Sequence, residues 1–187
     1  GEKTDYARRI SQQHKVTWLC ITTLLLIIGL LVSQYNTLLD SHITIGYSII
    51  NITKGVIGVK IILGLSTIAI LLMGMEQETK EVNFEWFILN ILALLGMYII
   101  IEANDLLVFY LGIELVSLSL YALAASKRSA KFSTEAGLKY FILGALSSGI
   151  LLFGIGLIYL STGSTTYIDI KALSIGGEGL KDIMSIG

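Results

Sequence analysis

One carboxylate lies deep within an apolar run of the sequence. Glu114 is the ninth residue of the run 106–125, which is ~13 Å along a helix. A charged carboxylate in hydrocarbon costs at least about 2.5–3.5 kcal/mol, so this side chain must face protein or water. A carboxyl group in such a place can take up and release a proton, which indicates proton or ion transport. The alternative is a buried Glu that only fixes neighbouring helices during assembly.

Further polar residues share a face with Glu114 if this run is helical. At about 100° per residue, Tyr110, Ser117 and Tyr121 lie within about 60° of it. We therefore expect a polar stripe along the helix, lining a hydrated or protein-lined path.

Two lysines also interrupt apolar runs. Lys139 follows Glu135 by four residues, in the favourable order for a helical ion pair. Lys60 has no acidic residue at helical spacing. Because each lysine is near the end of its run, the simplest interpretation of each is an anchor whose ammonium reaches the membrane surface. A difference in depth of roughly 10 Å argues against direct contact between Lys139 and Glu114.

The composition excludes several kinds of site. One cysteine, Cys20, cannot build a disulfide framework, a thiolate zinc site or an iron–sulfur cluster. His14 and His42 lie outside the apolar runs, which excludes a bis-histidine membrane haem. The net charge is -1 without a basic stripe, so nucleic acid is not expected as a partner. Motifs for phosphate binding, metal hydrolysis and serine chemistry are absent from the sequence. We expect no cofactor, metal or catalytic residue on this chain.

Membrane-spanning helices are the elements that must position these residues. The chain is 54% hydrophobic and only 14% charged, which is typical of a membrane protein. A helix needs roughly 20 mainly apolar residues to cross the hydrocarbon core. Five runs approach or exceed this length: 16–32, 55–75, 86–101, 106–125 and 136–160. We predict an all-α polytopic membrane protein whose five-helix bundle, 16–160, lies between a polar amino-terminal segment, 1–15, and a polar tail, 161–187.

Two connections carry local signals. Residues 102–105 alone separate the third and fourth spans, which predicts a tight antiparallel hairpin with Asn104 or Asp105 capping the fourth helix. Over 43–49, apolar residues alternate with Thr, Gly and Ser, which favours either a short strand or an extension of the second helix.

Small residues on the last span predict a close helix contact. Gly144 and Ser148 form a small-xxx-small pair, and Gly137 precedes Gly144 by seven residues. We interpret this face as a packing surface.

Basic residues predict the orientation of the bundle. If the amino terminus is inside, the inner segments hold Lys3, Arg8, Arg9, Lys15, Lys80, Lys127, Arg128 and Lys131, and the outer segments hold Lys54, Lys171 and Lys181. The excess on one side favours an amino terminus inside and a carboxyl terminus outside.

Two stretches resemble a known family. "EANDLLVFYLGIELVSLSLYALAA" and "STEAGLKYFILGALSSGILLFGIGLIYLSTGST" strongly resemble subunit 2 of the proton-pumping NADH:ubiquinone oxidoreductase, respiratory complex I, called the N subunit in bacteria. The resemblance is close over residues 102–160, looser over 84–101, and mainly one of hydropathy over 1–83.

The resemblance implies an antiporter-like subunit of the membrane arm, which contributes part of a proton-translocation path coupled to NADH:ubiquinone oxidoreduction. By motif, Glu114 would belong to a central axis of protonatable residues, and Lys139 to the same axis or to its coupling. The alternatives are a cation/proton antiporter subunit of the same family and a structural scaffold remnant that no longer pumps. Ser119 stands where the family commonly has proline, which puts a kink beside Glu114 in question.

The resemblance also implies cofactors, partners and a location. NADH, FMN, iron–sulfur clusters and ubiquinone would be elsewhere in the complex, so this chain would carry no redox chemistry. The sequence stops well before the end of such subunits and lacks their first span, which suggests part of a split or truncated subunit. We expect as partners other membrane-arm subunits, lipids and a companion chain with the remaining helices. The mitochondrial inner membrane, with the matrix inside, is the expected location, and a bacterial plasma membrane is the alternative.

Overall fold

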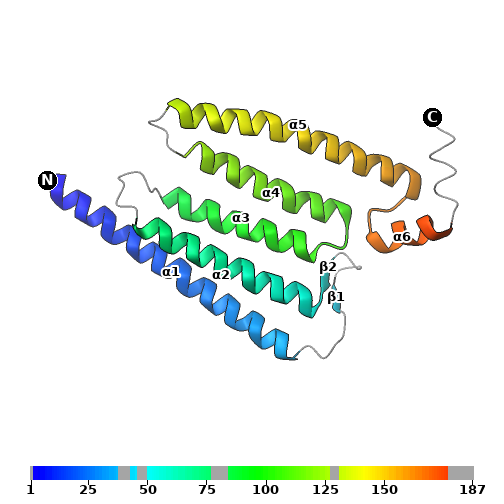
Figure 1. The fold of residues 1–187 in the computed structure, drawn as a ribbon, viewed down its shortest axis with the longest axis horizontal. Coiled ribbons are helices and arrows are strands. Elements are labelled where there is room, and N and C mark those ends of the chain that lie inside the picture. Colours follow the sequence, from blue (N-terminus) through cyan, green and yellow to red (C-terminus); the bar gives the residue numbers. More distant parts are fainter. Residues whose placement is uncertain (1, 38–42, 46–49, 77–83, 127–130, 177–187) are drawn as a thin grey trace.

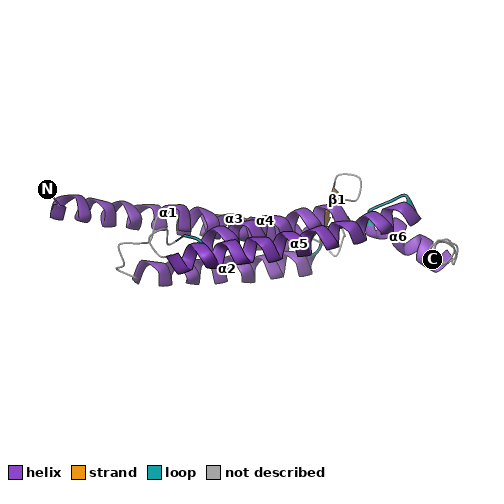
Figure 2. Cartoon of the chain, turned by 90° about the horizontal axis from the view of Figure 1, so that it is seen from above, coloured by secondary structure: helices purple, strands orange, loops and turns teal. Residues whose placement is uncertain are grey.

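The computed structural model describes residues 2–37, 43–45, 50–76, 84–126 and 131–176. Their elements, in chain order, are α1 (Glu2–Thr37), β1 (Ile43–Ile45), β2 (Ile50–Ile52), α2 (Lys54–Glu76), α3 (Phe84–Glu102), α4 (Leu106–Ala124), α5 (Lys131–Thr162) and α6 (Tyr167–Gly176). Figure 1 shows α1 to α5 side by side in chain order, with the amino terminus at one end and α6 at the other. Seen from above, the molecule is a flattened slab drawn out along the helix axes (Figure 2).

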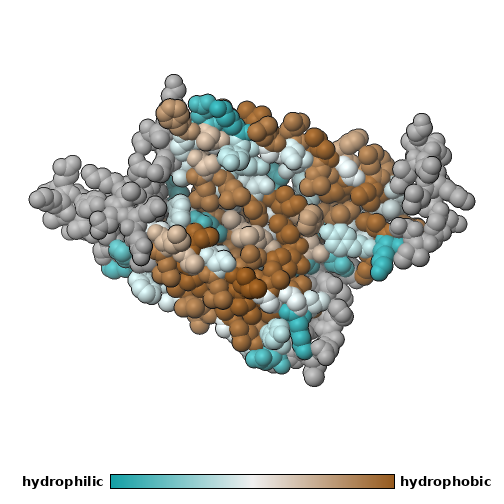
Figure 3. Space-filling model, viewed as in Figure 1, coloured by the Kyte–Doolittle hydropathy of each residue, from teal (hydrophilic) through white to brown (hydrophobic). Residues whose placement is uncertain are grey.

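Helices α1 to α5 confirm the prediction of an all-α polytopic membrane protein. Each contains a segment long and apolar enough to cross a membrane. The backbone groups of a helix are satisfied within the segment, which is what a chain in hydrocarbon requires. Figure 3 shows apolar side chains over most of the coloured face, with hydrophilic ones gathered toward its edges.

The helices extend beyond the apolar runs. Residues 2–15, expected as a polar lead, continue α1, and the expected polar tail contains α6. Length and hydropathy locate a crossing, but they do not mark where helical hydrogen bonding stops.

A short β-hairpin lies between α1 and α2. Strands β1 and β2 pair antiparallel, with Ile43 opposite Ile52 and Ile45 opposite Ile50. The strand interpretation of the alternating stretch is therefore correct for 43–45, whereas 46–49 lie outside the described residues. The hairpin, the α3–α4 turn and α6 lie at the same end of the bundle, hereafter the hairpin end (Figure 1).

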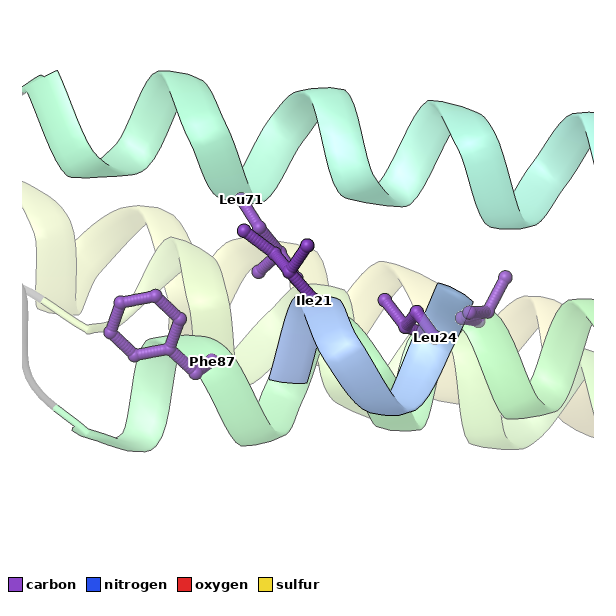
Figure 4. Close-up of a cluster of buried hydrophobic side chains, with 5 residues drawn as sticks. Ile21, Leu24, Leu71 and Phe87 are labelled. Atoms are coloured by element: carbon purple, nitrogen blue, oxygen red, sulfur yellow. The ribbon is translucent and has the colours of Figure 1, made fainter. Parts of the chain in front are cut away.

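The apolar core lies between the first three helices. Ile21 and Leu24 of α1 meet Leu71 of α2 and Phe87 and Leu94 of α3, and all five are buried. Figure 4 draws these side chains and shows Leu71 of α2 over Ile21 of α1, with Phe87 and Leu24 on either side. The α4 and α5 helices contribute little to this core, and each packs on its neighbour in the chain instead.

Two glycines bring α3 and α4 into close contact. A Cβ at Gly112 would lie 2.7 Å from Cγ1 and 3.0 Å from the backbone nitrogen of Ile100. A Cβ at Gly96 would lie 2.9 Å from the carbonyl oxygen of Gly112. Backbone atoms cannot swing aside as a side chain can, so glycine at both positions lets α3 and α4 pack as one rigid pair.

Asp105 starts α4, as one of the two expected caps. Its backbone is extended, and its carboxylate accepts from the backbone N–H groups of Leu107, at 2.8 Å, and Val108, at 3.3 Å. These bonds satisfy two of the free donors at the helix start. The same carboxylate accepts from the Thr165 hydroxyl at 2.5 Å, which ties the α5–α6 connection to the α3–α4 turn.

Candidate proton-path residues

Glu114 lies between α4 and α5. It is half-buried, and its Oε2 accepts a hydrogen bond from the Ser148 hydroxyl of α5. Gly112, two residues earlier, is the point of close contact with α3. The carboxylate is therefore held on a helix packed on both sides, and one hydroxyl from a second helix fixes its direction.

Tyr121 packs against the same face of α5. Its ring lies edge-on to Phe141, with centroids 6.2 Å apart and planes at 86°. A Cβ at Gly144 would overlap the Tyr121 hydroxyl at 1.6 Å, so the tyrosine fills the space that this glycine leaves. Tyr110 and Ser117 are half-buried on α4. The polar stripe that these three residues were expected to form with Glu114 stays a prediction.

The predicted small-residue surface of α5 is confirmed as a contact with α4. A Cβ at Gly137 would lie 2.5 Å from Cβ of Ala125, Gly144 receives Tyr121, and Ser148 bonds Glu114. The sequence interpretation assigned Ser148 to packing alone and missed it as the partner of Glu114. The sequence did indicate that Ser148 lies on the same helix face as Gly144. A helix face that allows close approach also brings its polar groups to the neighbouring helix, so this spacing could have predicted the contact.

Helix α4 is unbroken at Ser119. The Ser119 hydroxyl donates to the carbonyl oxygen of Leu115 at 2.7 Å and is buried. Unlike proline, serine keeps its backbone N–H and does not clash with the preceding turn. The kink that a proline would impose beside Glu114 is therefore replaced by a continuous helix.

Lys139 pairs with Glu135, as the spacing predicts. The Nζ to Oε1 distance is 2.6 Å, and the two side chains are 69% and 51% exposed. In the described part of the chain this pair is on the open surface of α5, whereas Glu114 points to Ser148. The structure thus does not bring Lys139 and Glu114 together, and their role in one proton path stays a prediction.

The anchor interpretation of Lys60 is wrong. Lys60 is buried, and its ammonium forms an ion pair with Glu102 at the end of α3. It also lies 5.0 Å from the ring centroid of Tyr98, whose hydroxyl donates to the Lys60 carbonyl at 3.0 Å. Helical spacing does not indicate this pair, because its members are 42 residues apart and belong to different helices. The predicted topology could have indicated the Lys60–Glu102 pair, since α2 begins and α3 ends at the same end of the bundle.

Among the described residues, no group of three or more His, Cys, Asp or Glu side chains is arranged to hold a metal ion. The described residues place the Glu114 carboxyl group in mid-span, the buried Lys60–Glu102 ion pair near the hairpin end and the exposed Lys139–Glu135 pair on α5.

Comparison with known proteins gives consistent matches. Residues 103–185 match the family described as NADH:quinone oxidoreductase/Mrp antiporter, transmembrane. The chain is 47% identical over 121 residues to NADH-quinone oxidoreductase subunit N of Jannaschia sp., covering 64% of this chain and 25% of that protein. It is 41% identical over 180 residues to NADH-ubiquinone oxidoreductase chain 2 of Marchantia polymorpha, covering 95% and 36%. The chain therefore spans only about a quarter to a third of the length of these relatives.

Two solved structures share the fold. A chain of respiratory complex I from Thermus thermophilus superposes with a TM-score of 0.68 at 24% identity, over 87% of this chain and 36% of that one. A chain of the archaeal membrane-bound sulfane sulfur reductase superposes with a TM-score of 0.66 at 22% identity, over 82% and 25%. The resemblance found in the sequence is thereby confirmed: residues 103–185 match the NADH:quinone oxidoreductase/Mrp antiporter transmembrane family, and the relatives at 41–47% identity are named subunit N and chain 2.

Proposed function

We propose that this chain is part of the membrane arm of a proton-translocating NADH:quinone oxidoreductase and contributes part of its proton path. The observation that carries the proposal is the half-buried Glu114 carboxylate in mid-span, bonded to Ser148 across the α4–α5 contact. The relatives named subunit N and chain 2 supply the reaction to which that path would be coupled.

Glu114 would act as a proton carrier. A carboxylate at this depth is costly unless it is paired or hydrogen-bonded, and a proton neutralises it. The Ser148 hydroxyl can donate to the charged carboxylate and can accept from the protonated carboxyl group, so both states keep a partner. A cation that approaches Glu114 would favour the charged form and release the proton, and its withdrawal would favour proton uptake. Lys139, Tyr110, Ser117 and Tyr121 would continue the path.

Further helices would complete the path. The chain spans about a quarter to a third of its relatives, and only 6% of the crossing segment of α5 is buried within it. We propose that additional helices of the subunit, together with lipid, cover α5 and bring the cation to Glu114. Other membrane-arm subunits would surround them. NADH, FMN, iron–sulfur clusters and ubiquinone would act elsewhere in the complex, in a mitochondrial inner membrane or a bacterial plasma membrane.

A cation/proton antiporter subunit is the second candidate function, because the matched family includes Mrp antiporters. The same carboxyl group would then exchange a proton for a metal cation without NADH oxidation. Scaffolding without transport is the third, and it predicts that Glu114 matters only for assembly.

Glu114→Gln separates these functions. In membranes that contain the assembled complex, we expect the variant to assemble in normal amount while proton translocation driven by NADH oxidation falls sharply, because Gln keeps the hydrogen bond to Ser148 but cannot titrate. Glu85→Gln, in the first turn of α3, is the matched control and should pump normally. Normal pumping by an intact Glu114→Gln complex would remove Glu114 from the path. Cation-dependent proton movement without NADH activity would favour the antiporter.

A further inference from the structure

The Lys60–Glu102 ion pair is a second buried charged site, separate from Glu114. Lys60 lies six residues into α2, or ~9 Å from its start. Glu102 is the last residue of α3. The two side chains are only 11% and 21% exposed. Tyr98, one helical turn before Glu102, closes the site with its ring beside the ammonium and its hydroxyl bonded to the Lys60 backbone.

Stability alone does not explain this pair. Two charges lose their hydration when buried, and well-packed apolar residues of similar volume are often as stabilising or more so. A lysine at this depth could also extend to the membrane surface and keep its hydration. Lys60 instead turns into the protein toward Glu102 and Tyr98. The site therefore maintains two titratable groups away from bulk water, within reach of one another.

Further polar groups lie near this site, at the hairpin end. Glu102 directly precedes the α3–α4 turn, whose buried Asp105 accepts from Thr165. The neighbouring Ser164 and Thr166 hydroxyls both donate to the exposed Asp169 at 2.7 Å. These hydroxyl and carboxyl groups thus lie at the same end of the bundle as Glu102, and Asp169 among them is exposed.

The site is also joined mechanically to Glu114. Helices α3 and α4 pack backbone to backbone at Gly96 and Gly112, so the ion pair connects α2 to the rigid pair of helices that carries Glu114. Glu114 is nine residues beyond Asp105, or ~13 Å along α4. That distance is too long for direct transfer and requires water or an intervening side chain.

We propose that Lys60 and Glu102 form a second proton-binding site, at the hairpin end, through which protons pass between Glu114 and the aqueous phase. The proposal rests on the proposed function. A proton that arrives on the Glu102 carboxylate neutralises it and leaves the Lys60 ammonium without its counter-charge. Loss of the Glu102 proton to water restores the ion pair directly. If Lys60 loses a proton to water instead, transfer of the Glu102 proton to the Lys60 amine restores the pair, so in either case one proton enters the site and one leaves.

Paired substitutions in the assembled complex test the proposal. Each single variant, Lys60→Met or Glu102→Leu, leaves one unpaired buried charge and can prevent assembly. The double variant Lys60→Met/Glu102→Leu removes both charges and preserves approximate volume. We expect it to assemble in normal amount, to oxidise NADH, and to lose as much proton translocation as Glu114→Gln does. The swapped variant Lys60→Glu/Glu102→Lys retains both titratable groups and should pump more than the apolar pair. Lys171→Gln on α6 is the exposed control and should pump normally.

Other results would overturn the proposal. Normal translocation by the apolar pair, beside a loss in Glu114→Gln, would make Lys60–Glu102 a purely structural contact. Failure of the apolar and swapped variants to assemble would likewise mark a structural requirement. If Glu114→Gln also pumps normally, the proposed function itself fails, and that result is distinct from a loss confined to Glu114.

Discussion

Gly112→Ala tests the close contact of α3 and α4. The new Cβ would lie 2.7 Å from Cγ1 of Ile100, 3.0 Å from its backbone nitrogen and 3.1 Å from the Gly96 carbonyl oxygen. Since two of these atoms belong to the backbone, the helices must move apart by a few tenths of an ångström. Overpacking of this kind costs about 1–3 kcal/mol.

Control substitutions isolate that cost. Gly29→Ala on α1 and Gly58→Ala on α2 add a Cβ with nothing within 4 Å. All three variants gain about 1 kcal/mol of helix propensity, which cancels in the comparison. The difference of about 1–3 kcal/mol corresponds to a Tm of Gly112→Ala that is about 2–12 °C below the controls.

Thermal release of the chain from the detergent-extracted complex measures this difference, with a fluorophore fused to the chain as the probe. The double variant Gly96→Ala/Gly112→Ala should cost less than the sum of the single variants, because both act on one contact. A Tm for Gly112→Ala equal to those of both controls would refute the close contact and, with it, the rigid connection between Glu102 and Glu114.

Three further changes give separate tests. Asp105→Ala should lower the free energy of unfolding by about 1 kcal/mol, because α4 loses its cap and Thr165 loses its hydrogen-bond acceptor. We expect faster amide hydrogen exchange at the start of α4. Unchanged exchange there would contradict the capping role. Hydrogen bonds from the Thr166 and Ser164 hydroxyls lower the pKa of Asp169. The stabilisation that these bonds give the start of α6 is therefore fully present above the ordinary Asp pKa of about 3.9 and is lost as pH falls through the lower folded value. After correction for the intrinsic exchange rate at each pH, protection of the first turn of α6 should fall with acid in the native chain but not in Asp169→Asn. Because the Lys139–Glu135 pair is exposed, Glu135→Gln should lower the free energy of unfolding by at most about 0.5 kcal/mol. Lys139→Met should reduce proton translocation without reducing the amount of complex. Equal translocation in the two variants would remove Lys139 from the path.

Local signals in the sequence predicted much of the fold. Five apolar runs gave five helices, because a chain in hydrocarbon must satisfy its backbone within each segment. The short turn predicted the α3–α4 hairpin and its Asp105 cap, and the small residues predicted the α5 contact. The ends of the helices were harder to predict from the sequence, since hydropathy indicates which residues cross the membrane and not where helical hydrogen bonding stops.

The sequence by itself determined that the chain crosses a membrane, that Glu114 lies in mid-span and that Lys139 has Glu135 one turn away, because each follows from spacing within a single helix. Only the tertiary structure decided which groups meet between helices. It placed Ser148 in hydrogen-bonding contact with Glu114, and it placed Glu102 in an ion pair with Lys60. Helical periodicity defines the face of one helix, whereas a partner on another helix depends on the depth and rotation of both. Packing at Gly96 and Gly112 sets these two quantities for α3 against α4, and packing at Gly144 sets them for α4 against α5.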